Sequence, residues 1–416
     1  MNAEENPAAI PEESKLVYDW NILRESRPMV DCVEFNDETL RDGIQSPSAR
    51  DPGIEEKLHM LHLMGILGIN AVCIGLPGAS ARQRADAKRL AEEIRDENLD
   101  ILPNCAARTV IADIEPILEI ADEISMPLEV CCFIGSSPIR QYTEDWDLDT
   151  MLRYSEKAVK FAVDHGMPVT FVTEDTTRTT PETIARLYTV AIEAGAQRIC
   201  VCDTVGHATP PGVRALINFV LDVVATTGEK VAIDWHGHED RSLGVWNTLT
   251  ALKAGAGRAH GTALGIGERC GNTAMDQLLI NCRLLGWIDN DLSKLTEYCK
   301  VTANAIGVPI PSNHPVIGGD AFRTGTGVHA AAVIKARNKG DDWLADRIYS
   351  GVPASMVGRR QRIEVGPMSG ASNVEYRLVA LGIEPDPDIV AAVLAAAKAA
   401  DHILDDREIG AVLAAI

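Results

Sequence analysis

Two histidines separated by a single glycine, His236 and His238, close an apolar run that begins at Val231. The run predicts a β-strand, and side chains alternate between the two faces of a strand. Both imidazoles should therefore point the same way and could share one ligand. Imidazole is a frequent metal ligand, although paired histidines also occur in ordinary hydrogen-bond networks. The pair predicts a metal site only where further ligand residues gather around it.

The elements that would position this pair repeat along the chain. Short apolar runs, typical of buried strands, alternate with longer amphipathic runs, typical of helices. The first helix carries Ile54, Leu58, Leu61 and Met64 or Leu67 on one face. Eight strand-then-helix units in about 260 residues match the count and length of a (β/α)₈ TIM barrel, an α/β fold. An open doubly wound sheet is the alternative, but no unit carries a G-x-G-x-x-G turn.

The boundaries of the eight units follow from the apolar pattern. Strands are expected at Val30–Phe35, Ile69–Leu76, Ile101–Cys105, Leu128–Ile134, Pro168–Thr173, Arg198–Asp203, Val231–His238 and Arg258–Leu264. Helices are expected at Pro52–Leu67, Ala81–Glu97, Ile111–Ile124, Leu148–His165, Pro181–Ala194, Pro211–Thr226, Leu243–Ala254 and Thr273–Leu285. The predicted domains are an N-terminal arm at 1–28, the barrel at 29–287, and smaller, mostly helical C-terminal subdomains at 288–416, with a glycine-rich, flexible lead-in at 318–327.

Polar residues follow several predicted strands, at the barrel end where active sites lie. Asp42 comes after the first strand, Glu174 ends the fifth, Thr204 follows the sixth, and Asn272 lies in a glycine-rich segment after the eighth. One carboxylate, two imidazoles and an amide oxygen form a mixed donor set that suits Mg²⁺, Mn²⁺ or Zn²⁺. Singly, Asp42 could cap a helix and Asn272 could serve a turn; their joint occurrence favours a metal site.

Composition excludes several classes of partner. The chain has 416 residues, 46% of them hydrophobic, which is enough for a large core. Its formal net charge of -21 argues against binding nucleic acid or an anionic membrane. No apolar run approaches the roughly 20 residues of a membrane span. The ten cysteines are scattered, and no signal peptide precedes them, so reduced thiols and a cytoplasmic location are expected. Cys200 and Cys202 could face one metal, but their apolar run favours packing.

Three separated segments carry a family resemblance: Asp37–Gln45, His236–His238 and Gly265–Asn272. They resemble the signature segments of the DRE-TIM metallolyase superfamily and, within it, the acetyl-CoA-dependent 2-isopropylmalate, citramalate and homocitrate synthases. The resemblance covers residues 30–380, and the motifs occur in the expected order. It implies a homodimeric, metal-dependent acyltransferase that condenses acetyl-CoA with a 2-oxo acid, as in leucine biosynthesis. The leucine-inhibited enzymes carry a C-terminal regulatory domain, which we expect this chain to lack.

The resemblance also implies residue roles in the barrel. Asp42, His236, His238 and Asn272 would bind the metal. Arg41 would stabilise an enolate or alkoxide oxygen, and Glu174 would take part in proton transfer. Thr204 would hold the keto-acid carboxylate, and Gln45, the last residue of the first motif, would also bind substrate.

Beyond the barrel, the resemblance points to two more residues. A segment like Gly327–Lys335 reaches over the barrel mouth in the synthases, often from the partner subunit, and its histidine helps to deprotonate the acetyl group. Here that residue is His329. Tyr349 matches a family tyrosine placed near the site. A lone histidine on a helix is more often structural, so the role of His329 depends on the resemblance.

The chain departs from the family pattern at four positions. Ile44 stands where an acidic residue is common, Cys73 lies where a glutamate is common, and Leu264 replaces an asparagine of the isopropylmalate synthases. Arg140 replaces their histidine. This arginine is either a surface residue or, if it points inward, a partner for a second carboxylate of a dicarboxylic substrate.

The expected reaction is a Claisen-type condensation. The metal would polarise the keto acid, Glu174 and His329 would remove a proton from the acetyl methyl group, and thioester hydrolysis would make the step irreversible. One alternative is a lyase of the 3-hydroxy-3-methylglutaryl-CoA type. Such lyases carry a catalytic cysteine shortly before the metal-binding asparagine, at a place held here by Ala263. A metal-storing barrel is the other alternative, but it leaves Arg41 and Thr204 unexplained.

Overall fold

The computed structural model describes residues 16–21 and 28–416. Its larger compact unit spans Leu23–Ile310, and the smaller one holds Pro311–Ile416. Most of the arm predicted over residues 1–28 lies outside the described residues. Among the described residues, no helix is both long and apolar enough to cross a membrane.

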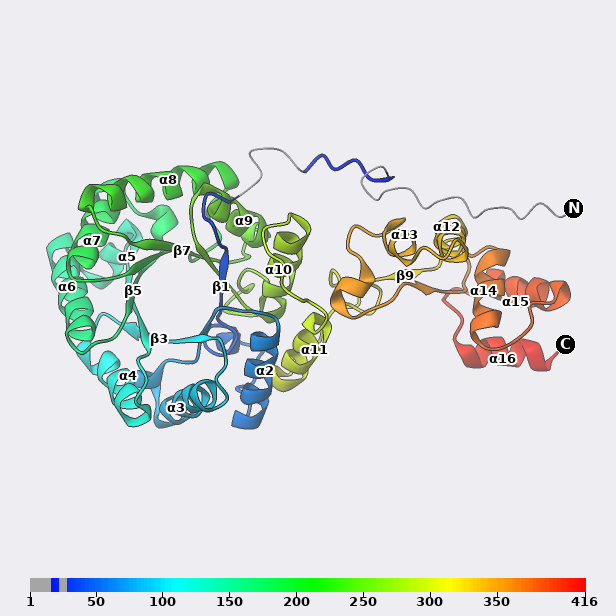
Figure 1. Cartoon of the computed structure of the whole chain (residues 1–416), viewed down its shortest axis with the longest axis horizontal. Coiled ribbons are helices and arrows are strands. Elements are labelled where there is room, and N and C mark those ends of the chain that lie inside the picture. The colour runs from blue at the N-terminus through cyan, green and yellow to red at the C-terminus, as the bar shows by residue number, and fades with distance from the viewer. Residues whose placement is uncertain (1–15, 22–27) are drawn as a thin grey trace, which may run out of the picture. The chain divides into compact units, whose positions relative to one another are not determined.

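The larger unit is a closed barrel of eight parallel strands in chain order, which confirms the predicted fold (Figure 1). Pairing of the first strand with the last, in the register Glu34 to Arg258, closes it. The strands are β1 Glu34–Asp37, β2 Ala71–Cys73, β3 Leu102–Arg108, β4 Glu129–Gly135, β5 Val169–Glu174, β6 Arg198–Asp203, β7 Ala232–Gly237 and β8 Arg258–Gly261. Closure brings the carboxyl ends of all eight strands to one mouth.

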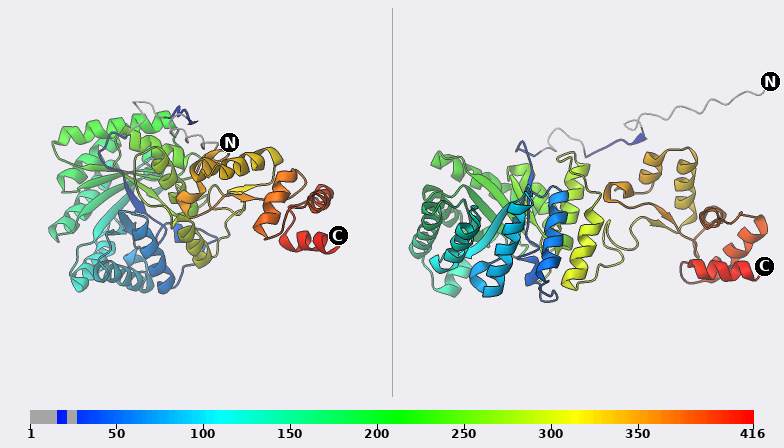
Figure 2. Two further views of the ribbon diagram at one scale, coloured as in Figure 1. Left: turned by 45° about the vertical axis from the view of Figure 1, so that its right-hand side comes forward. Right: turned by 60° about the horizontal axis from the view of Figure 1, so that its bottom comes forward.

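Helices surround the strands, as two further views also show (Figure 2). They are α2 Ile54–Ile66, α3 Ala81–Asp96, α4 Ile111–Ile124, α6 Leu148–Asp164, α7 Pro181–Glu193, α8 Pro210–Thr227, α9 Gly244–Ala254 and α10 Met275–Leu284. In α6, Asp147 caps the first turn by accepting a hydrogen bond from the Thr150 N–H, and Met151, Ala158 and Ala162 are buried. This 3.6-residue spacing of buried positions is what fixes such helices on a barrel.

The structure adds two helices that the predicted units did not define. The short α5, Pro138–Glu144, lies between β4 and α6. Helix α11, Leu295–Ile306, lies beside α2 (Figure 1). Because of this packing, the larger compact unit extends to Ile310 rather than to the predicted boundary at 287.

The interior of the barrel near the amino-terminal ends of its strands holds buried charges instead of a purely apolar core. The Arg258 guanidinium, 1% exposed, donates to both oxygens of Glu129 at 3.0 Å and to Asp234 at 2.7 Å. Asp234 also accepts from Arg198 at 2.9 Å and lies 3.1 Å from the His260 imidazole. Buried charges persist in folded proteins when each has such partners.

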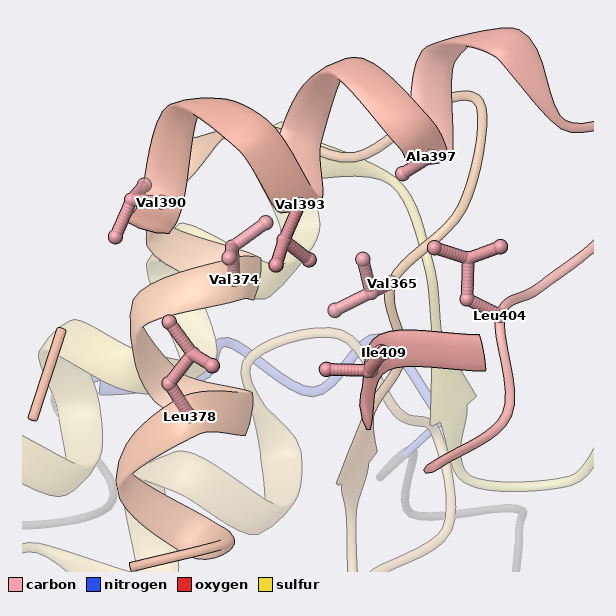
Figure 3. Close-up of a cluster of buried hydrophobic side chains, with 8 residues drawn as sticks. All are labelled: Val365, Val374, Leu378, Val390, Val393, Ala397, Leu404 and Ile409. Atoms are coloured by element: carbon pink, nitrogen blue, oxygen red, sulfur yellow. The ribbon is translucent and has the colours of Figure 1, made fainter. Parts of the chain in front are cut away.

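The smaller unit is mostly helical, as predicted. It contains α12 Gly327–Asn338, α13 Asp342–Arg347, α14 Ala371–Ala380, α15 Pro387–Ala399 and α16 Asp406–Ala414. Two short strands, β9 Arg323–Thr324 and β10 Arg362–Ile363, pair in parallel, and β9 lies inside the glycine-rich segment at 318–327. Apolar side chains from α14, α15, α16 and the segments that precede α14 and α16 form a core of their own (Figure 3), made of Val365, Val374, Leu378, Val390, Val393, Ala397, Leu404 and Ile409.

Candidate metal and active site

A cavity of about 260 Å³ opens at the carboxyl ends of the barrel strands. It brings together seven of the residues singled out from the sequence: Arg41, Asp42, Gln45, Glu174, Thr204, His236 and His238. These residues come from four separate strand ends, so only closure of the barrel places them side by side. The volume suits a small ligand rather than a polymer.

Three side chains form a compact group of metal-ligand type. His236, near the end of β7, and His238, just after it, hold their Nε2 atoms 3.2 Å apart. The Asp42 Oδ2 lies 3.4 Å from the first imidazole and 3.8 Å from the second. Burial opposes ionisation of Asp42, but Arg41 and His236 outweigh it and hold the pKa of the carboxyl well below its usual range. The group therefore offers one carboxylate and two imidazoles.

The hydrogen bonding of His238 leaves one particular nitrogen available to a metal. Its Nδ1 lies 3.2 Å from the Gly271 carbonyl oxygen, which can only accept a hydrogen bond. The proton must therefore be on Nδ1, and the Nε2 lone pair is left facing Asp42. Burial, with the neighbouring His236, lowers the pKa of His238 to about 4, so the ring is neutral near pH 7. A neutral imidazole with one oriented lone pair is the form that ligates metals.

Asn272 completes the group from the segment after β8. Its Nδ2 donates to Asp42 Oδ2 at 2.7 Å, while its Oδ1 is buried and has no hydrogen-bond partner among the described residues. A buried amide oxygen without a partner is costly. An asparagine amide can present either its N–H or, after a half-turn, its oxygen. The donor set of two imidazoles and two oxygens fits a divalent cation.

Sequence reasoning did not single out Glu38 or His260, which line the same cavity. With His236 they form a second group of ligand-type atoms. Glu38, however, accepts from Arg41, and the His260 imidazole lies 3.1 Å from both Glu38 and Asp234. Because these groups already satisfy one another, the group around Asp42 is the better metal site. The signal for His260 was its place two residues after Arg258, on the same face of β8.

Two predicted polar residues lie on the β5 and β6 side of the cavity. Burial raises the pKa of Glu174, at the end of β5, above its ordinary value, although Arg140 opposes the shift. The Thr204 hydroxyl oxygen accepts a hydrogen bond from the Asp175 N–H at 2.8 Å. That contact leaves the hydroxyl proton available to a ligand. A proton acceptor and a hydrogen-bond donor thus face the same space.

Arg140 lies beside the site but does not line the cavity. It is in the first turn of α5, its side chain is 42% exposed, and its Nη2 lies 3.3 Å from Glu144 and 4.0 Å from Glu174. A Cβ on Gly135, the last residue of β4, would come within 2.7 Å of the Arg140 Nε, so the arginine packs over the end of that strand. Its Nη2 is within ion-pair distance of two carboxylates, while its Nε is buried without a hydrogen-bond partner among the described residues.

Apart from Glu268 and Arg269, the rest of the cavity wall is apolar and rich in cysteine. Cys200 and Cys202 on β6 have sulfur atoms 3.9 Å apart. Burial raises the pKa of the Cys200 thiol well above its ordinary value, so it packs as a small hydrophobic group. The other apolar or thiol side chains of the wall are Cys73, Leu76, Ala106, Cys131, Phe133 and Val172.

The last two predicted residues lie in the smaller unit and contact each other. The His329 ring, on α12, stacks on the Tyr349 ring with a centroid distance of 4.0 Å and an interplanar angle of 24°. Both residues are exposed. The sequence suggested each of them separately, and the structure shows that they form a pair.

Comparison with known proteins shows the family of the chain. A family model described as HMGL-like matches residues 32–303. "Homocitrate synthase AksA" of Methanopyrus kandleri is 33% identical over 382 residues, covering 91% of this chain and 89% of that protein. A "Probable 2-isopropylmalate synthase" of Ignicoccus hospitalis is 33% identical over 365 residues, covering 87% and 86%.

The same fold occurs in solved structures. The crystal structure of the Bacillus subtilis HMG-CoA lyase superposes with a TM-score of 0.57 at 20% identity, covering 69% of this chain and 97% of that one. In this chain the place of the lyase cysteine is held by Ala263, which is fully buried. The nearby Cys270 is exposed.

Proposed function

From the premise that the chain belongs to the HMGL-like family and, within the DRE-TIM metallolyase superfamily, to the acetyl-CoA-dependent synthases, we propose that it catalyses a Claisen condensation. The methyl carbon of acetyl-CoA attacks the keto carbon of a 2-oxo acid, and water then cleaves the thioester to release coenzyme A. The observation that carries the proposal is the mixed donor set of Asp42, His236, His238 and Asn272 beside Arg41 and Glu174.

The placement of the side chains supports a role for each of them. A divalent cation held by the four donors would supply Lewis-acid polarisation of the keto group. Arg41, next to Asp42, would stabilise the oxygen on which negative charge develops. Thr204 donates a hydrogen bond from its hydroxyl to the substrate carboxylate, and Gln45, exposed at the cavity mouth, contacts the substrate there. Glu174 accepts a proton, because its raised pKa makes it a stronger base than an exposed glutamate.

The proposed base for the acetyl methyl group includes His329, with Tyr349 as its neighbour. The stacked rings keep the imidazole in one orientation, and its exposure leaves it free to meet a substrate. His329 and Tyr349 belong to the smaller unit, so they would join the barrel site either of their own chain or of a partner subunit.

We propose a 2-oxo acid with a short, apolar side chain, which makes the activity 2-isopropylmalate synthase-like and places it in leucine biosynthesis. Apolar and thiol groups dominate the wall away from the metal site. Among the described residues that line the cavity, Arg41 is paired with Glu38 and Arg269 with Asp240. A second substrate carboxylate would therefore have to compete for a cation, which favours this substrate over those of homocitrate-type enzymes.

The test is thiol release from acetyl-CoA with a panel of 2-oxo acids. We expect release with 2-oxoisovalerate and weaker release with pyruvate, 2-oxoglutarate or oxaloacetate, each dependent on added Mg²⁺, Mn²⁺ or Zn²⁺. Asp42→Ala serves as the inactive control. Thiol release with none of these acids, or cleavage of 3-hydroxy-3-methylglutaryl-CoA instead, would contradict the proposal.

A further inference from the structure

Glu38 is the buried carboxylate that meets Arg41 most closely. Its Oε2 accepts a hydrogen bond of 2.8 Å from the Arg41 Nε and a second, shorter one from Nη2. Its Oε1 accepts from the Asn36 Nδ2 at 2.9 Å and lies 3.1 Å from the His260 Nδ1. The carboxylate side chain is only 5% exposed. Both of its oxygens are therefore fixed, and two of its contacts go to one guanidinium.

The contacts of Glu38 continue into the floor of the barrel. The opposite nitrogen of the His260 ring lies 3.1 Å from Asp234 Oδ2, and the same oxygen accepts from Arg258 at 2.7 Å. An unbroken sequence of hydrogen-bonded polar groups thus runs from Arg258 to Arg41. Residues within such a network hold one another in a single rotamer.

Arg41 has a second neighbour, and that neighbour is a proposed metal ligand. Its Nη2 lies 3.7 Å from Asp42 Oδ2, the oxygen that faces both histidines. An arginine freed from Glu38 would turn to this carboxylate, because a buried guanidinium needs a charged partner. It would then compete with the cation for Asp42 and leave the position where the reacting oxygen lies.

We infer that Glu38 is a positioning residue: it holds Arg41 in the orientation needed for the reaction and prevents it from pairing with the proposed metal ligand Asp42. His260, which contacts Glu38 on the side away from Arg41, holds Glu38 in place. This inference rests on the proposed function for its effect on turnover. Its effect on Arg41 and on metal binding does not require that function.

Glu38→Gln keeps the size of the side chain and removes its charge. We expect the affinity for Mn²⁺, measured by titration calorimetry on purified full-length protein, to fall at least fivefold. We expect kcat to fall at least thirtyfold, while the KM for the 2-oxo acid changes less than threefold. A crystal structure of the variant should show the Arg41 guanidinium moved to Asp42.

The matched control is Glu34→Gln. Glu34 lies at the other end of β1 and also pairs with an arginine, Arg198, at 2.9 Å, but it does not line the cavity. The Glu34→Gln substitution should change the Mn²⁺ affinity and kcat less than twofold.

A double-mutant cycle separates positioning from general support of the fold. In an Arg41→Ala background, Glu38→Gln should lower kcat less than threefold, because the residue it positions is gone. An equal loss of kcat in both backgrounds, or an unmoved Arg41 with unchanged Mn²⁺ affinity, would overturn the inference.

If Glu38→Gln does not fold, Glu38→Asp replaces it, since its shorter carboxylate keeps the charge but cannot reach both Arg41 and His260. Failure of the wild type to release thiol would refute the proposed function alone, because the crystallographic and calorimetric measurements remain decisive.

Discussion

At the scale of single residues, the site depends on two imidazoles whose Nε2 atoms both lie near one carboxylate. Removing either ligand should abolish both turnover and tight metal binding, because open catalytic sites have few ligands to spare. We therefore expect His236→Ala and His238→Ala to retain less than a tenth of the wild-type metal content after dialysis, measured by elemental analysis.

The fold of both variants should remain intact, as judged by their far-UV circular dichroism. His165→Ala, an exposed histidine at the end of α6, is the control and should keep its metal. Full metal occupancy in His236→Ala or His238→Ala would mean that the metal binds elsewhere.

Arg140 tests the choice of substrate. If Arg140 bound the second carboxylate of a dicarboxylic substrate in a desolvated pair, Arg140→His would shift the preference toward 2-oxoisovalerate by about 1–3 kcal/mol. Because the side chain is 42% exposed and already faces Glu144 and Glu174, we expect less than about 1 kcal/mol. The measurement is the ratio of kcat/KM for 2-oxoisovalerate and 2-oxoglutarate in both proteins. A shift of more than tenfold toward 2-oxoisovalerate would show that Arg140 does bind substrate.

The sequence predicted some of these residues and missed others for a physical reason. His236 and His238 are neighbours along one strand, and Asn272 lies in a glycine-rich turn, so local spacing indicates them. Glu38 and His260 become neighbours only when β1 pairs with β8, in the register that places Asn36 opposite His260. Local spacing shows that His260 shares a strand face with Arg258, but it does not show that barrel closure brings His260 to Glu38.

At the scale of elements, the segment after β8 positions the metal ligands through a glycine. Gly271 has φ +101°, and a Cβ there would lie 1.8 Å from the Gly265 carbonyl oxygen. Its own carbonyl orients His238, and the next residue is Asn272. We expect Gly271→Ala to weaken metal binding about 10–100-fold, the usual effect of disturbing groups that orient ligands.

Gly286, after α10, supplies the control for this prediction. Its φ is +69°, but a Cβ would meet nothing within 4 Å, so Gly286→Ala has the backbone strain without the collision. It should cost about 1 kcal/mol of stability and leave metal affinity unchanged. Equal metal affinity in the two variants, measured by calorimetric titration, would mean that Gly271 does not position the metal ligands.

The end of β1 carries a carboxyl group whose burial links stability to pH. Burial raises the pKa of Asp37 to about 6, although hydrogen bonds from Thr39 and Tyr298 of α11 oppose the shift. Between its unfolded value near 4 and about 6, the folded state binds more protons than the unfolded state. The contribution of Asp37 is therefore fully present below pH 4 and is lost as pH rises through 6.

Asp37→Asn should lack this dependence. The unfolding free energy of the wild type relative to the variant should fall by on the order of 2 kcal/mol between pH 4.5 and pH 7.5. Urea denaturation of both metal-free proteins across this range measures it. Parallel curves would mean that Asp37 titrates alike in the folded and unfolded states.

Element types were predictable, and some boundaries were too: β6 and α4 lie where the sequence predicted them, whereas others, such as those of β1, do not. The alternation of apolar runs predicted all eight strands and the helices between them. The first strand was expected at Val30–Phe35 and lies at Glu34–Asp37, because its last residues, Asn36 and Asp37, are polar yet fully buried. Where the interior of a barrel is polar, the apolar run in the sequence ends before the strand does. Helix α5, seven residues long, is too short to show a periodic pattern.

At the scale of the whole molecule, the residues of the proposed reaction are divided between two compact units. Asp42 and the other metal-site residues belong to the unit Leu23–Ile310, whereas His329 and Tyr349 belong to Pro311–Ile416. Each unit has its own apolar core. Separate cores allow the smaller unit of one chain to serve the barrel of another, as the family resemblance implies for a homodimer.

This arrangement makes complementation between inactive chains possible. His329→Ala would lack the base and Asp42→Ala would lack the metal site. If sites form across subunits, a hybrid of the two has one site with both defects and one with neither. Mixing equal amounts and allowing subunit exchange should therefore recover about a quarter of wild-type activity, as random pairing makes half of the dimers hybrid and restores one of their two sites. Thiol release measures the recovery, and mass spectrometry of isotope-labelled chains verifies the exchange. Activity that stays at the level of the separate variants after verified exchange would mean that each site is built within one chain.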